Sequence, residues 1–188
     1  MIQETIVTTQ NKAGKTHIAP MGIHVAGDEF IILPFRPSVT LDNILETQTA
    51  VINYTDDVRV FAGCVTGRKQ WPLKKAKKIE GNFLENTLSH CEVKLTHLDD
   101  DPMRPKLFCR AVHQVNHSAF KGFNRAQFSI LEAAILLSRV DRLSPAKINT
   151  ELEYLHIGFN KTAGAKEREA WGWVTQAIEQ KLREMQRL

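Results

Sequence analysis

Cysteine is scarce in this chain, and its spacing excludes the usual cysteine-based sites. The 188 residues include three cysteines, and none of them stand in C-x-x-C spacing: Cys64, Cys91 and Cys109. An odd number of thiols cannot all pair within one chain, so a disulfide framework is not expected. We interpret the three as small core residues of a protein in a reducing, cytoplasmic compartment.

Long apolar runs are also missing. No stretch approaches the roughly 20 residues that a membrane-spanning helix needs. Residues 1–15 lack the basic segment followed by an apolar segment that marks a secretory signal. We therefore expect a cytoplasmic location and no membrane partner.

The motifs of familiar catalytic and metal sites are absent as well. The chain contains no G-x-S-x-G, G-x-x-x-x-G-K or H-E-x-x-H sequence. His113 and His117 are four residues apart on a predicted strand, whereas that spacing suits a metal site on a helix. His90 and His97 are predicted on opposite faces of their strand. We expect no metal site and assign no catalytic residue.

The charge balance is mildly basic, with 25 basic and 21 acidic residues and a net charge of +4. This balance suits small anionic ligands and is too weak to indicate nucleic acid. The run Lys74–Lys78 contains no interleaved aromatic residues, so we interpret it as a solvated face. No nucleic-acid partner is expected.

The first two thirds of the chain have the pattern of strands, in which β-branched stretches are separated by turn residues. Six segments are predicted as strands: 3–9, 16–25, 29–33, 49–55, 88–98 and 107–115. Short turns join the first three, which predicts an antiparallel meander, and the last two form a long hairpin. Helix starts are predicted at Thr40 and at Asp56 or Asp57.

The last third has helical spacing. Four residues share one face of a helix within 125–140: Phe128, Leu131, Ile135 and Leu136. The final helix carries a clear apolar stripe: Trp171, Val174, Ile178, Leu182 and Met185. We therefore predict a β-rich α+β fold, an antiparallel barrel over 1–122 followed by a helical region over 123–188.

One segment has the groups that a phosphate needs. Arg36 supplies a guanidinium fork, Ser38 and Thr40 supply hydroxyls, and a helix beginning at Thr40 would add unpaired N–H groups and a favourable dipole. The alternative is an exposed loop that precedes a plain helix cap. Both interpretations stay open from the residues alone.

A second segment would allow a flat ring to approach the backbone. It is the sequence Ala19, Pro20, Met21 and Gly22, in the middle of a predicted strand. The alternative is a simple β-bulge at a barrel corner. Asn53, on another strand, has a side chain that can donate or accept at a ring edge, or can hydrogen-bond across the strands.

Several stretches together resemble a known family. They are ETIVTT, HIAPMGI, ILPFRPSVTLDNI and VINYTDD in the first half, and FNRAQFSILEAAILLSRVDRL and KTAGAKEREA in the second. The chain resembles a group of prokaryotic proteins classified as a domain of unknown function. Their fold is the FMN-binding split barrel, which flavin reductases share.

The resemblance implies an FMN cofactor and a homodimer with the flavin at the subunit interface. The cofactor contacts that it implies are Ala19, Pro20, Met21, Gly22 and Asn53 near the ring, Asn43, Arg36, Ser38 and Thr40 near the phosphate, and Asn124 and Arg125 from the helical region. Flavin reductases often have Lys-Asp-Thr in the phosphate loop. This chain departs from that pattern with Ser38-Val39-Thr40, so Arg36 would supply the positive charge that the lysine supplies in flavin reductases.

The function implied is that of an FMN-dependent oxidoreductase, with a small-molecule substrate or electron donor that the sequence does not identify. Two alternatives stay open. One is a flavin-binding or carrier protein without enzymatic activity, and the other is a pterin-linked protein of one-carbon metabolism, since a pterin resembles the flavin ring system.

Overall fold

The computed structural model describes residues 1–185. The chain divides into two compact units. The barrel unit contains residues 1–55 and 71–120, and the helical unit contains residues 56–70 and the chain from 121 onward. The predicted division at residue 122 left residues 56–70 with the barrel, whereas the structure groups them with the helices.

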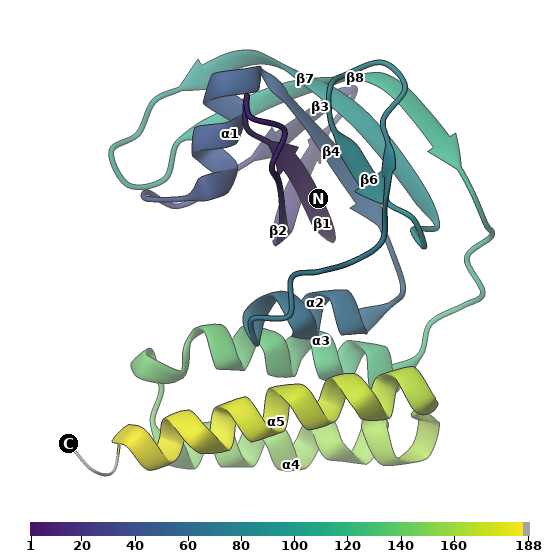
Figure 1. Cartoon of the computed structure of the whole chain (residues 1–188). Helices are drawn as coiled ribbons and strands as arrows, with labels where there is room; N and C mark the ends of the chain where they lie inside the picture. Colours follow the sequence, from purple (N-terminus) through teal and green to yellow (C-terminus); the bar gives the residue numbers. More distant parts are fainter. Residues whose placement is uncertain (186–188) are drawn as a thin grey trace. The chain divides into compact units, whose positions relative to one another are not determined.

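Six strands form the closed barrel in the order β1-β2-β3-β8-β7-β4, and each is antiparallel to its neighbours (Figure 1). They are β1 (Ile2–Gln10), β2 (Thr16–Ala26), β3 (Glu29–Ile32), β4 (Thr49–Tyr54), β7 (Ser89–Asp99) and β8 (Lys106–Asn116). The predicted β-rich α+β fold with an antiparallel barrel is therefore confirmed.

The barrel interior is filled by aliphatic side chains that alternate with outward-facing residues, as a pleated strand requires. Val7, Ile23 and Ile52 are among those with almost no exposed surface. Helix α1 (Val39–Thr47) adds Leu41 and Ile44 to the same core. Burial of each such side chain contributes about 1.5–3 kcal/mol, so the packing of α1 against the barrel is fixed.

Helix α1 begins two residues earlier than predicted. Ser38, rather than Thr40, is the cap residue, and its Oγ accepts a hydrogen bond from the Leu41 N–H at 3.3 Å. Thr40 already lies in the first turn, where its side chain is buried. A serine and a threonine two positions apart both favour the cap, and the packing of Leu41 selects the first of them.

The three cysteines are buried and form no disulfide within residues 1–185, which agrees with their interpretation as core residues. Cys91 and Cys109 belong to the barrel core. Burial raises the pKa of the Cys64 and Cys91 thiols to about 11 and that of Cys109 to about 12.

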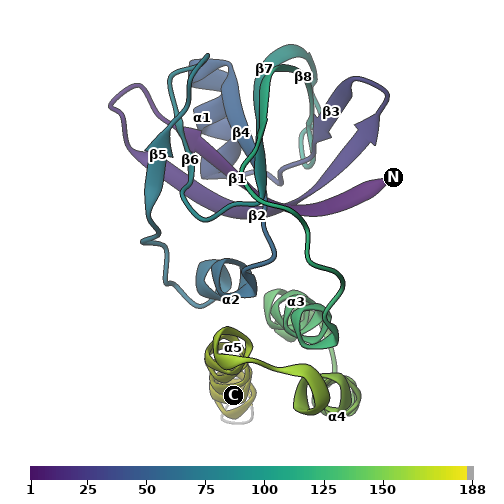
Figure 2. The same ribbon diagram turned by 90° about the vertical axis from the view of Figure 1, so that its right-hand side faces the viewer.

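A small hairpin, β5 (Leu73–Lys75) and β6 (Asn82–Leu84), lies beside β1 and β4 (Figure 2). Asn53 of β4 links its own strand to β1 and to β6. Its Nδ2 donates to the Ile6 carbonyl at 3.0 Å and to Thr8 Oγ1 at 3.2 Å, and its Oδ1 accepts from the Leu84 N–H at 2.8 Å. The cross-strand alternative for Asn53 is therefore the role that the structure gives it.

The helical unit packs α2 (Val58–Val65), α3 (Arg125–Ser138), a short 3-10 turn (Val140–Arg142), α4 (Pro145–Thr162) and α5 (Ala165–Met185) around one core. Asp57 caps α2, as predicted, by accepting from the Arg59 N–H. Val174 and Ile178 of the predicted α5 stripe are fully buried, and Trp171, Leu182 and Met185 pack beside them.

The predicted apolar face of α3 is wrong at Phe128, which is 53% exposed, whereas Leu136 of that face does pack against the core. The residues that the helix buries include Ile130, Ala133 and Leu137. Because α3 packs against α2, α4 and α5, small residues on several sides are covered and the large ring is left outside. None of the helices in residues 1–185 combines the length and the apolar character needed to cross a bilayer.

Replacing Asn53 with Ala should destabilise the barrel unit by about 1–3 kcal/mol, because the buried Leu84 N–H and Thr8 hydroxyl each lose a partner. Urea denaturation followed by circular dichroism measures the loss. The exposed Asn86 provides a matched control, and Asn86→Ala should change the free energy of unfolding by less than about 0.5 kcal/mol. Equal effects of the two substitutions would contradict the assigned role.

Candidate functional site

The first part of β2 has an open edge. Strand β3 pairs with β2 only over Ile23–Ala26, so in residues 1–185 the ladder partners of residues 19–22 all lie in β1. An edge strand presents N–H and C=O groups to whatever approaches it. Pro20 is tolerated here because an edge position does not need its missing N–H.

The side chains of this segment alternate between the two faces of the sheet. Ala19 pairs with the inward-facing Val7, and Met21, two residues further on, packs against the barrel core. Pro20 and Gly22 point the other way, and all four residues are half-buried. The predicted ring site is thus a regular edge strand, and a bulge does not occur in its pairing with β1.

The N-terminus of α1 offers free donors. The Leu41 and Asp42 N–H groups bond to Ser38, whereas those of Val39 and Thr40 have no partner within the described residues. The Ser38 hydroxyl accepts the capping bond and keeps its own proton to donate. Two free N–H groups and a hydroxyl at a helix N-terminus suit an anion.

Arg36 lies immediately before this helix, and a cis peptide bond links it to Pro37. Its guanidinium is about one third exposed and forms an ion pair with Asp100, in the turn that joins β7 to β8. The backbone N–H of Arg36 donates to the Met103 carbonyl at 3.0 Å. The predicted cation is therefore three residues before the first free N–H group in the chain, and a carboxylate already balances its charge.

Thr40, Asn43 and Asn53 are the predicted contacts that the structure buries. Asn43 Nδ2 donates to Thr9 Oγ1 at 3.0 Å, which ties α1 to β1. The Asn43 and Asn53 side chains link elements of the barrel unit and the Thr40 side chain is buried, whereas Ala19–Gly22, Arg36 and Ser38 are accessible. The β2 segment 19–22 and the N-terminal turn of α1 both adjoin the barrel core, since Met21 packs against the buried cluster that contains Leu41.

The two predicted contacts of the helical region have different surroundings. Asn124 caps α3, where its Oδ1 accepts from the Ala126 N–H at 2.8 Å and its Nδ2 donates to the Thr162 carbonyl. Arg125 is exposed and lines an apolar hollow of about 180 Å³. The other residues around this hollow are Phe128, Ser129, Tyr154, Leu155, Ile157 and Gly158.

Sequence reasoning missed a buried polar chain in the barrel unit. His90 Nδ1 lies 2.8 Å from His117 Nε2, and His90 Nε2 lies 3.4 Å from Glu92 Oε1. The His90 ring stacks on Phe83 with a centroid distance of 4.0 Å. If His117 Nε2 donates to His90 Nδ1, then His90 Nε2 donates to the carboxylate, so the chain leads from exposed His117 to buried Glu92.

The environment keeps the carboxylate charged and the inner imidazole neutral. Burial raises the pKa of Glu92, but hydrogen bonds from the Lys77 and Lys78 N–H groups outweigh burial and leave the pKa below its ordinary value. Burial lowers the pKa of His90, against the opposing effect of Glu92. In residues 1–185 no group of three or more His, Cys, Asp or Glu side chains is arranged to hold a metal ion.

Comparison with known proteins identifies the family. The model of the DUF447 N-terminal domain, a protein of unknown function, matches residues 3–118, and the model of the following DUF447 region matches residues 124–176. The predicted recognition of a domain-of-unknown-function family is thereby confirmed.

Solved structures share the fold. An FMN-bound protein of Methanosarcina mazei with the same family model has a TM-score of 0.81 at 17% identity, over 94% of each chain. The 2-nitrobenzoate 2-nitroreductase of Pseudomonas fluorescens has a TM-score of 0.54 at 22% identity, over 61% of this chain and 64% of its own. An FMN-binding protein of Thermus thermophilus, solved with 1-cyclohex-2-enone, has a TM-score of 0.51 at 12% identity, over 60% and 69%.

The three structures have the split-barrel fold that the resemblance implied, and the M. mazei protein matches the helical region as well. The two family models together span most of the chain. The chain therefore belongs to the DUF447 family.

Proposed function

We propose that this chain binds FMN non-covalently and acts as a flavin-dependent oxidoreductase, in a homodimer with the flavin at the subunit interface. The observation that carries the proposal is the FMN-bound M. mazei protein, which shares the family model and the fold over 94% of both chains. The nitroreductase of similar fold supports the class of chemistry.

The accessible groups of the barrel unit fit the two ends of FMN. A phosphate needs donors and positive charge, which the Val39 and Thr40 N–H groups, the Ser38 hydroxyl and Arg36 offer. A flat ring needs an open, weakly obstructed backbone, which residues 19–22 of β2 offer. No buried side-chain nitrogen or oxygen in residues 1–185 lacks a partner, so the contacts with the cofactor are assigned to these surface groups.

When bound, FMN would supply the hydride or electron transfer, and the protein would supply binding, orientation and tuning. The residues named above hold and orient the cofactor. No side chain is assigned as a general acid or base, which agrees with the absence of a catalytic motif in the sequence. The substrate therefore has to be identified by experiment.

The exposed apolar surface of the helical unit supports a partner subunit. Phe128, Tyr154 and Ile157 are 53%, 67% and 54% exposed and line the same apolar hollow. Water contact with such a patch is unfavourable, and patches of this kind often mark interaction surfaces. A second copy of the chain would cover it, and Arg125 at its edge would then lie near the interface.

The purified protein should be yellow and release FMN, identified by mass, on denaturation. Anaerobic addition of NADH or NADPH should bleach the flavin band near about 450 nm if the protein is an oxidoreductase. Bound flavin that is not reduced by any pyridine nucleotide would favour a carrier. A colourless protein that does not bind added FMN would refute the proposal, and a bound pterin would replace it.

Arg36→Ala should weaken FMN binding by about tenfold, because one charge-assisted hydrogen bond contributes about 1.5 kcal/mol. Asp100→Asn should bind FMN at least as tightly as the wild type, since it frees the Arg36 guanidinium. Arg110→Ala, an exposed arginine on β8, is the control and should leave affinity unchanged. Fluorescence titration of the four proteins decides. Equal weakening by Arg36→Ala and Asp100→Asn would mean that Asp100 is needed to position Arg36.

The protein should have the mass of a dimer in size-exclusion chromatography with light scattering. The double substitution Tyr154→Glu and Ile157→Glu places charges in the apolar patch and should yield monomers with FMN affinity reduced. Gln176→Glu, at an exposed position on α5 outside the hollow, is the control and should remain dimeric. A wild-type monomer, or a dimer unaffected by the double substitution, would contradict the proposed interface.

A further inference from the structure

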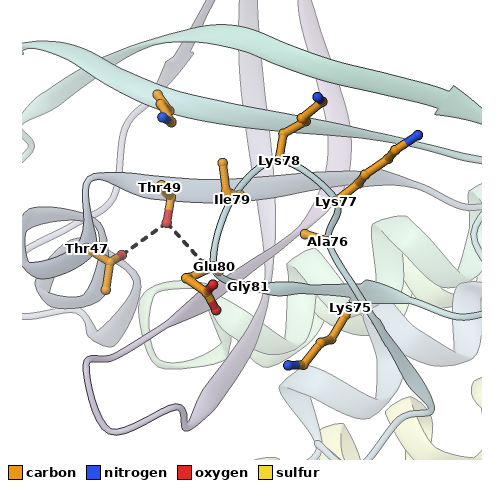
Figure 3. A pocket seen from close by; sticks show the side chains of 10 residues that line it. Thr47, Thr49, Lys75, Ala76, Lys77, Lys78, Ile79, Glu80 and Gly81 are labelled. Atoms are coloured by element: carbon orange, nitrogen blue, oxygen red, sulfur yellow. Dashed lines mark hydrogen bonds between the residues drawn. The ribbon is translucent and has the colours of Figure 1, made fainter.

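Besides the hollow of the helical unit, the barrel unit contains a hollow of its own, of about 420 Å³ (Figure 3). It is formed by the loop of residues 75–81, which we call the lysine loop. Thr47, Thr49 and Lys94 complete its lining. Its volume lies in the range of small-molecule sites, which is about 300–1,000 Å³. The sequence predicted the lysines here as a solvated face, without a concave surface.

Positive charge is concentrated around this hollow. Lys75, Lys77, Lys78 and Lys94 are exposed and form no ion pair within the described residues, whereas the neighbouring Lys74 pairs with Glu85 at 3.2 Å. Four lysines and the carboxylate of Glu80 line the hollow, and the charged Glu92 carboxylate lies beneath the loop, so these six groups leave a charge of +2. Figure 3 shows Lys77 and Lys78 extending to the same side of the loop. A concave surface with uncompensated charge attracts anions.

The lysine loop is held in place from below by a buried carboxylate. Glu92 accepts hydrogen bonds from the backbone N–H groups of Lys77 and Lys78 at 2.7 and 2.6 Å. The loop is also closed by a bond from the Ala76 N–H to the Gly81 carbonyl at 2.9 Å. Its backbone is therefore ordered before any ligand arrives, which reduces the entropy lost on binding.

Burying a charged side chain to hold a loop carries a large desolvation penalty. Glu92 has no exposed surface, and removing a carboxylate from water costs several kcal/mol that its partners have to offset. The backbone amides of two consecutive lysines, with His90, are those partners. The Glu92 carboxylate therefore fixes the backbone of Lys77 and Lys78, whose side-chain charges are unpaired. The cost of burying it supports a binding role for these two lysines.

We propose that the lysine loop binds a small ligand that carries phosphate groups, at a site separate from that of FMN. Lysines bind phosphate as point charges, and four of them line the hollow. The Thr49 hydroxyl, in the same lining, donates to Thr47 Oγ1 at 3.3 Å and to the Glu80 carbonyl at 3.4 Å, which ties the loop to α1 and β4. Thr47 is the last residue of α1, whereas the donors assigned to the FMN phosphate are at its first turn. Eight residue steps separate Val39 from Thr47, which is about 12 Å at 1.5 Å per residue.

Inorganic pyrophosphate is the probe, and isothermal titration of the purified chain saturated with FMN is the measurement. The wild type should bind, and the double substitution Lys77→Ala with Lys78→Ala should bind about tenfold more weakly. Lys12→Ala with Lys15→Ala removes the same charge from another exposed turn and should bind within about twofold of the wild type. Equal binding by all three proteins would overturn the proposal.

A competition experiment shows whether the lysine loop binds a separate phosphate ligand or the phosphate of FMN itself. Pyrophosphate affinity should be the same with and without FMN, and FMN affinity should be unchanged in the lysine variant. If FMN displaces pyrophosphate, the lysine loop holds the flavin's own phosphate and the separate site is refuted. The pyrophosphate titration can also be carried out on a chain that binds no FMN. Failure of FMN binding and failure of the lysine-loop site are therefore distinguishable. Binding of a single-stranded oligonucleotide more tightly than pyrophosphate would refute the small ligand.

The anchoring by Glu92 has its own readout. Trypsin cuts after lysine, so cleavage within the lysine loop should be slow in the wild type and slower still with pyrophosphate. Glu92→Gln should speed this cleavage several-fold while circular dichroism shows an intact fold. Should that variant not fold, the pyrophosphate protection of the wild type still tests the site, and no protection at saturating pyrophosphate would refute it.

Discussion

Barrel closure is the constraint on which the rest of this structure depends. Strand β1 pairs with β2 along its whole length but with β4 only from Ile6 to Thr8. So short a ladder leaves few backbone hydrogen bonds at the seam, and the Asn53 amide strengthens it from the side. Strand β3, which follows β2 in the sheet order, is also short, so residues 16–22 of β2 have ladder partners on one side, in β1. The closed barrel and the open edge thus have the same origin in strand lengths.

Much of the barrel could be predicted because its signals are local. The hairpins of β1 with β2 and of β7 with β8 follow from alternation and turn residues, and both were predicted. The role of Asn53 could not be chosen, since a buried amide and a ligand contact look alike in sequence. Residues 56–70 were assigned to the barrel because nothing in their composition changes there, and only long-range packing places α2 with the helices.

The polar chain of Glu92, His90 and His117 was missed for a different reason. Period-two reasoning assumes that the outer face of a strand meets solvent. Cys91 and Val93 do face the barrel core, but His90 and Glu92 on the opposite face are also buried, because Phe83 stacks on His90 and the lysine loop bonds to Glu92. The contacts of Glu92 with Lys77 and Lys78 also join irregular chain to strand, for which no spacing rule exists. A charge run in sequence gives no indication that a carboxylate fixes it.

The three buried thiols have a consequence for a protein proposed to carry a flavin. Reduced flavins pass electrons to oxygen, and the peroxide that forms attacks thiolates rather than thiols. With a pKa of about 11 for Cys64 and Cys91 and about 12 for Cys109, hardly any thiolate exists near neutral pH. The chain therefore places its thiols where the by-product of such chemistry does little damage to them, and they should stay reduced during long storage without a reducing agent.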